Sequence, residues 1–164
     1  MALIKVGMAD LKAVKHPDNL TTLGLGSCIG VTLYDPSSKI SGMAHFMLPD
    51  STQIKNNENK AKFGDTAIEE LLKQMLSLGA SKTKLIAKIA GGAQMFSFGE
   101  KNDLMRIGER NAIAAKEKLK ALGIRLVAED TGKNYGRTIE FMSENGDLHV
   151  KTIGKELKVI WDEN

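Results

Sequence analysis

Apolar and polar positions follow a period of two in several short stretches of this chain and a helical period in two longer ones. Residues 29–33 alternate apolar residues with small or polar ones, which predicts a strand with one buried face. Residues 40–47 are expected to form its hairpin partner, because residues 35–38 have the composition of a turn. Further strands are expected at residues 3–8, 85–90, 124–129, 137–143, 148–153 and 157–161.

The two longer stretches have the spacing of amphipathic helices. The first opens at Thr66 with a capping-box pattern that includes Glu69, and Gly79 suits its C-terminal end. The second runs from about residue 108 to residue 122 and is expected to stop at Gly123. The residues predicted to face the core are Ile68, Leu71, Leu72, Met75 and Leu76 in the first helix, and Ala112, Ala115, Leu119 and Leu122 in the second.

Together these elements predict an α/β fold in which a mixed β-sheet is layered with helices. We expect a single domain over residues 1–164, because this length suits one core and the sequence contains no internal repeat or inter-domain linker. The polar stretch 53–62, rich in Asn and Lys, is the expected mobile loop.

Composition narrows the class of protein. Hydrophobic residues make up 42% of the chain and charged residues 26%, which is typical of a globular protein. The net charge of +3 is mild and the basic residues are dispersed, so the sequence favours no nucleic-acid partner. It contains no apolar run of membrane-spanning length, and its N-terminus does not resemble a signal peptide. We therefore expect a cytoplasmic protein without membrane insertion.

The candidate chemistry centres on Cys28, the single cysteine, and on His45 in the partner strand. If residues 35–38 form the loop, Tyr34 pairs with Lys39, and stepping back along both strands places Cys28 opposite His45. Directly opposed side chains have Cβ atoms roughly 4.5–5.5 Å apart, so thiol and imidazole would lie near hydrogen-bond reach. A cysteine and a histidine in this arrangement are a candidate nucleophile and base.

The glycine-rich run before the cysteine supports this interpretation. Glycine lets backbone approach a ligand closely, and a bend at Gly26 and Ser27 can direct the N–H groups of Ser27 or Cys28 toward a developing oxyanion. A structural alternative stays open, in which Cys28 is a buried apolar residue, His45 is structural and the glycines form a tight turn. No metal site is expected, because His16, His45 and His149 lack ligand spacing.

Several motifs in this order resemble the CheD family of chemoreceptor glutamine deamidases. They are Thr-Leu-Gly-Leu-Gly-Ser-Cys at 22–28, Met-Ala-His-Phe-Met-Leu-Pro-Asp-Ser at 43–51, and the blocks at 87–96, 107–111 and 128–132. The resemblance covers about the whole chain and implies a fold of the cysteine-hydrolase type. One departure is Lys133, where the family often has a second glycine.

The resemblance also implies roles and partners. It makes Cys28 the nucleophile, His45 its base and Thr22 the third member of a triad, with no cofactor. The implied substrates are glutamines on the cytoplasmic helices of chemoreceptors, and the implied partner is a CheC-type phosphatase. We expect Met95, Phe96 and Phe98 to form a partner surface, because such surfaces favour methionine and aromatic residues, although core packing would explain them equally well.

Two rival functions remain at the level of sequence. One is a different cysteine amidohydrolase, such as a peptidase or an amidase for free glutamine. The other is a non-catalytic module that binds receptors or the phosphatase, with Cys28 in a structural role. Activity on protein-bound as against free glutamine separates the first, and thiol reactivity separates the second.

Overall fold

The computed structural model describes residues 1–95, 106–152 and 154–160, and its strands form two five-stranded sheets over these ranges. The first sheet has the order β1-β3-β8-β9-β10 and the second has the order β2-β5-β4-β6-β7. The strands of the first sheet are β1 (Leu3–Lys5), β3 (Asn19–Leu25), β8 (Arg137–Phe141), β9 (Leu148–Lys151) and β10 (Lys158–Ile160). Those of the second are β2 (Asp10–Lys15), β4 (Ile29–Asp35), β5 (Ile40–Phe46), β6 (Ile86–Gly91) and β7 (Arg125–Thr131).

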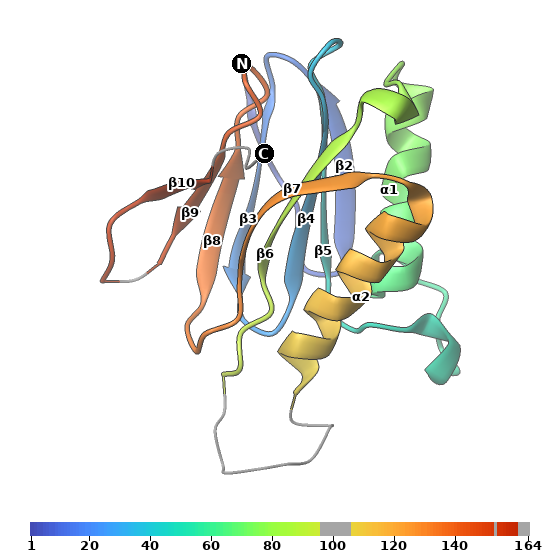
Figure 1. Ribbon diagram of the computed structural model, residues 1–164, viewed down its shortest axis with the longest axis vertical. Coiled ribbons are helices and arrows are strands. Elements are labelled where there is room, and N and C mark those ends of the chain that lie inside the picture. The colour runs from blue at the N-terminus through green and yellow to red at the C-terminus, as the bar shows by residue number, and fades with distance from the viewer. Residues whose placement is uncertain (96–105, 153, 161–164) are drawn as a thin grey trace.

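Helices α1 (Gly64–Ser77) and α2 (Ile107–Leu122) lie against the second sheet, on the side away from the first (Figure 1). Short 3₁₀ helices η1 (Ser51–Gln53), η2 (Lys60–Lys62) and η3 (Lys82–Lys84) lie in the connections. The result is a three-layer sandwich of sheet, sheet and helices, which confirms the predicted α/β class. The sequence predicted one mixed β-sheet and did not predict that the strands divide into two sheets.

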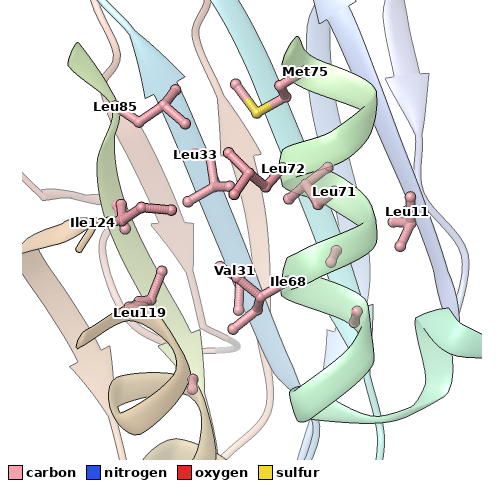
Figure 2. Close-up of a cluster of buried hydrophobic side chains, with 14 of the residues drawn as sticks. Leu11, Val31, Leu33, Ile68, Leu71, Leu72, Met75, Leu85, Leu119 and Ile124 are labelled. Atoms are coloured by element: carbon pink, nitrogen blue, oxygen red, sulfur yellow. The ribbon is translucent and has the colours of Figure 1, made fainter. Parts of the chain in front are cut away.

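Two apolar cores hold the layers together, and β4 contributes to both. Val31 and Leu33 pack toward the helices, where Ile68 and Leu72 of α1 face them (Figure 2). The alternate residues of β4 face the first sheet, where Tyr34 joins the inter-sheet core. All of β4 is therefore buried, as expected for a central strand that is covered on both faces. The inter-sheet core also contains Leu20, Leu25, Cys28, Met43, Ile139 and Phe141.

The hairpin of β4 and β5 forms as predicted, but the predicted register is wrong by two residues. Asp35 pairs with Ile40, and Gly30 rather than Cys28 pairs with His45. The strand extends to Asp35 because its carboxylate accepts hydrogen bonds from the Ser37 N–H and hydroxyl, at 2.9 and 2.7 Å, which organises a later turn. A shift of two residues keeps every side chain on its predicted face, since strand side chains alternate with a period of two.

The start of α1 also differs from the prediction. The helix begins at Gly64, and the Thr66 hydroxyl donates to the Lys60 carbonyl at 2.6 Å instead of capping its own helix. Thr66 therefore lies inside the first turn, and the capping-box interpretation was wrong. The stop of α2 at Gly123 is confirmed, because this residue is the left-handed C-cap with φ of 74°.

Strands β2 and β3 were not predicted. The sequence of β2 carries polar residues at alternate positions, and it lies at the edge of its sheet, so only Leu11 is fully buried. The sequence of β3 contains two threonines and a glycine, and its pattern resembles a loop. It is a strand because it pairs on one side with β1 and on the other with β8, which is far away in the sequence.

Candidate active site

Thr22, Cys28 and His45 all face the space between the two sheets. Thr22 lies on β3, Cys28 in the turn that leads from β3 into β4, and His45 near the end of β5. Thr22 is 0% exposed and His45 is 1% exposed, whereas Cys28 is 7% exposed. Of the three, Cys28 is therefore the side chain nearest to solvent.

A chain of two short hydrogen bonds fixes the histidine ring. The Thr22 hydroxyl donates to the Val6 carbonyl at 2.7 Å, and the same oxygen lies 2.7 Å from His45 Nδ1. A hydroxyl has one proton, so Thr22 must accept from an Nδ1–H of His45. The neutral ring then carries its proton on Nδ1, and the lone pair of Nε2 is available as a base.

The backbone around Val6 explains why its carbonyl is in place. Strand β1 runs parallel to β3, with Lys5 beside Thr21, and the Val6 N–H continues the pairing by donating to the Thr21 carbonyl at 2.8 Å. Val6 is 1% exposed, so its carbonyl has a buried position and needs a partner. Thr22 supplies that partner and connects the first sheet to His45 in the second.

His45 Nε2 has no hydrogen-bond partner among the described residues, although it is buried. The Cys28 thiol shares the inter-sheet layer but forms no hydrogen bond with His45 there. The observed register explains this spacing, because Cys28 lies diagonally from His45 on the same face instead of directly opposite. The structure thus joins Thr22 to His45 and leaves an unpaired nitrogen on the face that carries the thiol.

The turn that holds Cys28 is fixed through its carbonyl groups. The Gly26 carbonyl accepts from the Ala93 N–H, and the Cys28 carbonyl accepts from the Gly92 N–H, both at 2.9 Å. In a planar trans peptide the N–H points opposite to the carbonyl, so the bond to Gly26 directs the Ser27 N–H away from Ala93. No acceptor lies at this N–H in the described ranges.

Two glycines allow the close approach of backbone at this turn. A Cβ on Gly91, whose φ is +110°, would lie 2.3 Å from the Cys28 carbonyl oxygen. A Cβ on Gly30 would lie 2.7 Å from Cδ1 of Ile139 in the facing sheet. Only glycine therefore fits at Gly91 without moving the cysteine turn, and a Cβ at Gly30 would require the end of the Ile139 side chain to shift.

Burial favours the neutral forms of both candidate catalytic groups. Burial raises the pKa of the Cys28 thiol, and the Cys28 N–H opposes this effect only in part. Burial also lowers the pKa of His45. Both directions argue against a thiolate–imidazolium pair near neutral pH. A neutral thiol beside a neutral base is the resting state that the site supports.

The predicted partner surface is only partly within the described residues. Met95 is 44% exposed, and its Cγ lies 3.3 Å from the position that a Cβ on Gly26 would occupy. It therefore covers the turn that leads to Cys28. Phe96 and Phe98 lie outside the described residues. In the described part of the chain no group of His, Cys, Asp and Glu has the arrangement of a metal site.

The stretch 53–62 is organised by its own polar side chains. It contains the end of η1 and all of η2, and the Asn57 and Asn59 side chains donate to the carbonyls of Ser51 and Ala9 at 2.9 and 3.2 Å. Its expected mobility is not tested by these contacts and stays a prediction. The stretch leads from the end of β5 to α1, on the side of the sheet where the helices lie (Figure 1).

Sequence reasoning assigned no role to two buried polar residues beside the cysteine turn. Asn111 of α2 donates from Nδ2 to the carbonyls of Ser27 and Met47, at 3.0 and 2.9 Å. Arg137 of β8 donates to the carbonyls of Gly91 and Gly132, at 3.3 and 3.1 Å, and pairs with Asp130. The signal for Asn111 is its polar side chain on a helix face that is otherwise apolar. Arg137 lies in a predicted strand and gave no such signal.

Comparison with known proteins adds a family to this geometry. Residues 47–152 match the family model described as CheD chemotactic sensory transduction. A probable chemoreceptor glutamine deamidase CheD of Lachnoclostridium phytofermentans is 61% identical over 96% of this chain and 98% of its own length. The corresponding protein of Caldanaerobacter subterraneus is 60% identical over the same shares of the two chains. The chemoreceptor glutamine deamidase CheD of Halalkalibacterium halodurans is 52% identical, again over 96% and 98%.

None of the helices in the described ranges is long and apolar enough to cross a membrane.

Proposed function

This chain belongs to the CheD family, and on that basis we propose that it is a chemoreceptor glutamine deamidase with Cys28 as its nucleophile, acting in chemotaxis adaptation. The observation that carries the proposal is the hydrogen-bond chain from Val6 through Thr22 to His45 Nδ1, because it leaves the lone pair of Nε2 free on the face that carries the thiol. The near-full-length similarity to proteins named as chemoreceptor glutamine deamidases supports the substrate.

The first half of the reaction is acylation of the thiol. His45 Nε2 takes the proton of Cys28 as the thiolate attacks the side-chain amide carbon of a receptor glutamine. The N–H groups of Ser27 and Cys28 stabilise the negative charge on the amide oxygen. The imidazolium then gives its proton to the leaving nitrogen, so ammonia departs and a thioester remains on Cys28.

Hydrolysis completes the cycle. His45 Nε2 takes a proton from water as the hydroxide attacks the thioester carbon. The Cys28 sulfur then leaves and takes this proton back from the imidazolium, so glutamate is released and the neutral thiol and imidazole are restored. Thr22 accepts from Nδ1–H throughout and keeps Nε2 directed at the reacting atoms, as an orienting group does in related triads. Because burial raises the pKa of the Cys28 thiol, the site favours proton transfer to His45 during the attack over a thiolate formed beforehand.

The partners follow from the same proposal. The substrate segment is a cytoplasmic helix of a chemoreceptor, which places the protein in the cytoplasm. A CheC-type phosphatase is the second proposed partner, as the family resemblance implies. Exposed Met95 over the cysteine turn is a candidate contact for either protein, because methionine adapts its shape to a partner.

The test is mass spectrometry of a receptor cytoplasmic fragment after incubation with the protein. Wild type should convert specific glutamines to glutamate, and Cys28→Ala should not. Ser41→Ala is the matched control. Ser41 lies on the same face of β5 as His45 and is buried like Cys28, and its replacement by alanine also removes one side-chain heavy atom. Its rate should stay near that of wild type.

Three outcomes would overturn the proposal. Deamidation by Cys28→Ala at the wild-type rate would exclude the cysteine mechanism. Conversion of free glutamine with no effect on the fragment would identify a small-molecule amidase, and binding of the fragment without any conversion would identify an adaptor.

A further inference from the structure

Asn111 occupies a position where an apolar side chain would be expected. It lies on the face of α2 that carries the buried Ala115 and Leu119, and it is itself 0% exposed. Burying a carboxamide is unfavourable unless its polar atoms find partners. Both protons of Asn111 Nδ2 do, since the group donates to the carbonyls of Ser27 at 3.0 Å and Met47 at 2.9 Å, whereas Oδ1 has no hydrogen-bond partner among the described residues.

These two carbonyls lie where the hairpin opens. The pairing of β4 with β5 ends at Ile29 and Phe46, and beyond this point the two strands diverge. Met47 and Leu48 turn away to donate to the Lys62 carbonyl, at 2.8 and 3.1 Å. The single amide group of Asn111 therefore joins the two strands beyond their last pair. One of its acceptors directly precedes Cys28 and the other lies two residues after His45.

We propose that Asn111 is a positioning residue, which orients the peptide between Ser27 and Cys28 so that the Cys28 N–H faces the developing oxyanion. The inference rests on the proposed function. The Ser27 carbonyl and the Cys28 N–H belong to one planar trans peptide and point in opposite directions. The hydrogen bond from Asn111 to the Ser27 carbonyl therefore fixes the direction of the Cys28 N–H. It also polarises the peptide, which makes the Cys28 N–H a stronger donor.

Neighbouring contacts support the same arrangement. The preceding peptide is held by the Ala93 N–H on the Gly26 carbonyl, at 2.9 Å, and the following one by the Gly92 N–H on the Cys28 carbonyl, also at 2.9 Å. Asn111 supplies the middle contact of the three, and it is the only side chain that does so among the described residues. Each of the three consecutive carbonyls of Gly26, Ser27 and Cys28 therefore has its own donor, and the N–H of each of these peptides points away from that donor.

The test separates oxyanion stabilisation from thiol reactivity. Asn111→Leu keeps a side chain of similar size and removes both donors. We expect kcat for deamidation of a receptor fragment to fall about 100-fold, as when an oxyanion donor is lost or displaced. The KM should change by less than about twofold, because the interaction acts in the transition state. Alkylation of Cys28 by iodoacetamide needs no oxyanion site, so its rate at a pH above the thiol pKa, where the thiolate is fully formed, should match wild type.

Leu119→Ala is the matched control for a loss of packing. Leu119 is buried on the same helix, two turns further on, and its apolar side chain donates no hydrogen bond. This variant should melt at a lower temperature with kcat close to that of wild type. If Asn111→Leu does not fold, Asn111→Ala is measured with the same criteria, because alanine preserves the helix and removes the same donors.

Three results would overturn the inference. The first is a kcat for Asn111→Leu within about threefold of wild type, because displacement of the Cys28 N–H should lower kcat by about 100-fold. The second is a parallel fall of deamidation and alkylation, which would indicate a general loosening of the turn. The third is a loss of kcat in Leu119→Ala equal to that in Asn111→Leu. Failure of the proposed function itself is recognised separately, by deamidation that persists in Cys28→Ala.

Discussion

Replacing Thr22 by valine removes one hydroxyl from the centre of the hydrogen-bond chain and keeps the shape of the side chain. Thr22 is fully buried, so no water from the surface reaches the vacated place directly. The Val6 carbonyl loses its donor, and the Nδ1–H of His45 loses its acceptor. The variant therefore leaves two buried polar groups unpaired and frees the histidine ring to change its tautomer.

The magnitude follows from these two losses. Each unpaired buried group costs about 1–3 kcal/mol, so the free energy of unfolding should fall by roughly 2–4 kcal/mol after partial relaxation. The catalytic loss is bounded by the contribution of a general base, about 10²–10⁴-fold. Thr22 orients this base and is not the base itself, so we expect kcat to fall by about 10–100-fold.

The assay is the initial rate of deamidation of a receptor fragment, measured well below the melting temperature of the variant. Nitrogen-15 NMR of His45 reports the tautomer directly, and the resonances of wild type should show the proton on Nδ1. Thr22→Ser is the control, because it keeps the hydroxyl, and its rate should stay within about threefold of wild type. A Thr22→Val rate within twofold of wild type, or a wild-type proton on Nε2, would refute the reasoning.

Three further predictions concern protonation and packing. Because burial raises the pKa of the Cys28 thiol, its alkylation rate should rise with pH only above the ordinary thiol pKa, and a plateau of reactivity near pH 6 would contradict this. Burial lowers the pKa of His45, so below about pH 6.5 this histidine binds more protons in the unfolded chain than in the folded one. The contribution of His45 to the free energy of unfolding is therefore complete above about pH 6.5. It is lost as the pH falls from there toward the pKa of the folded state. In His45→Gln, melting curves should lose this part of the pH dependence. Gly30→Ala places a methyl 2.7 Å from Ile139 Cδ1 and should destabilise the fold by about 1–3 kcal/mol in denaturant titrations; an unchanged midpoint would show that the two sheets separate easily.

A fifth prediction concerns the hairpin turn. Burial alone would raise the pKa of Asp35, but hydrogen bonds from Ser81 and Ser37 outweigh it and lower this pKa to about 2. The lowered pKa stabilises the fold above pH 4, and this contribution is lost as the pH falls from about 4 toward 2. Asp35→Asn should be less stable than wild type at pH 7 and nearly equal to it at pH 2. A constant difference between these pH values would contradict the assignment.

Local patterns in the sequence predicted most of the helices and strands. Periodicity located both helices and the hairpin of β4 and β5, because the burial of one face determines where apolar residues recur. It did not locate β2 or β3, since an edge strand and a strand with two threonines lack that pattern. The register was wrong because the side chain of Asp35 extends the strand, a contact that residue types alone do not determine.

In the candidate site, too, the sequence predicted what depends on local pattern and missed what depends on contacts between distant elements. The period of two correctly predicted that Cys28 and His45 share one face. This prediction holds despite the wrong register, because a shift of two residues leaves each side chain on the same face. The role of Thr22 came only from the family resemblance, because its bond to His45 joins the two sheets. The contacts of Val6 and Asn111 likewise depend on tertiary packing between elements far apart in the sequence. No local pattern predicts such contacts.

The claim that Cys28 forms a thioester with the substrate can be tested most directly with hydroxylamine. This nucleophile competes with water for the acyl group, so wild type in its presence should convert receptor glutamines into hydroxamates as well as glutamates, and mass spectrometry distinguishes the two products. Cys28→Ala should form neither product, and Ser41→Ala should form both. Glutamate as the sole product at every hydroxylamine concentration, or either product from Cys28→Ala, would contradict the account.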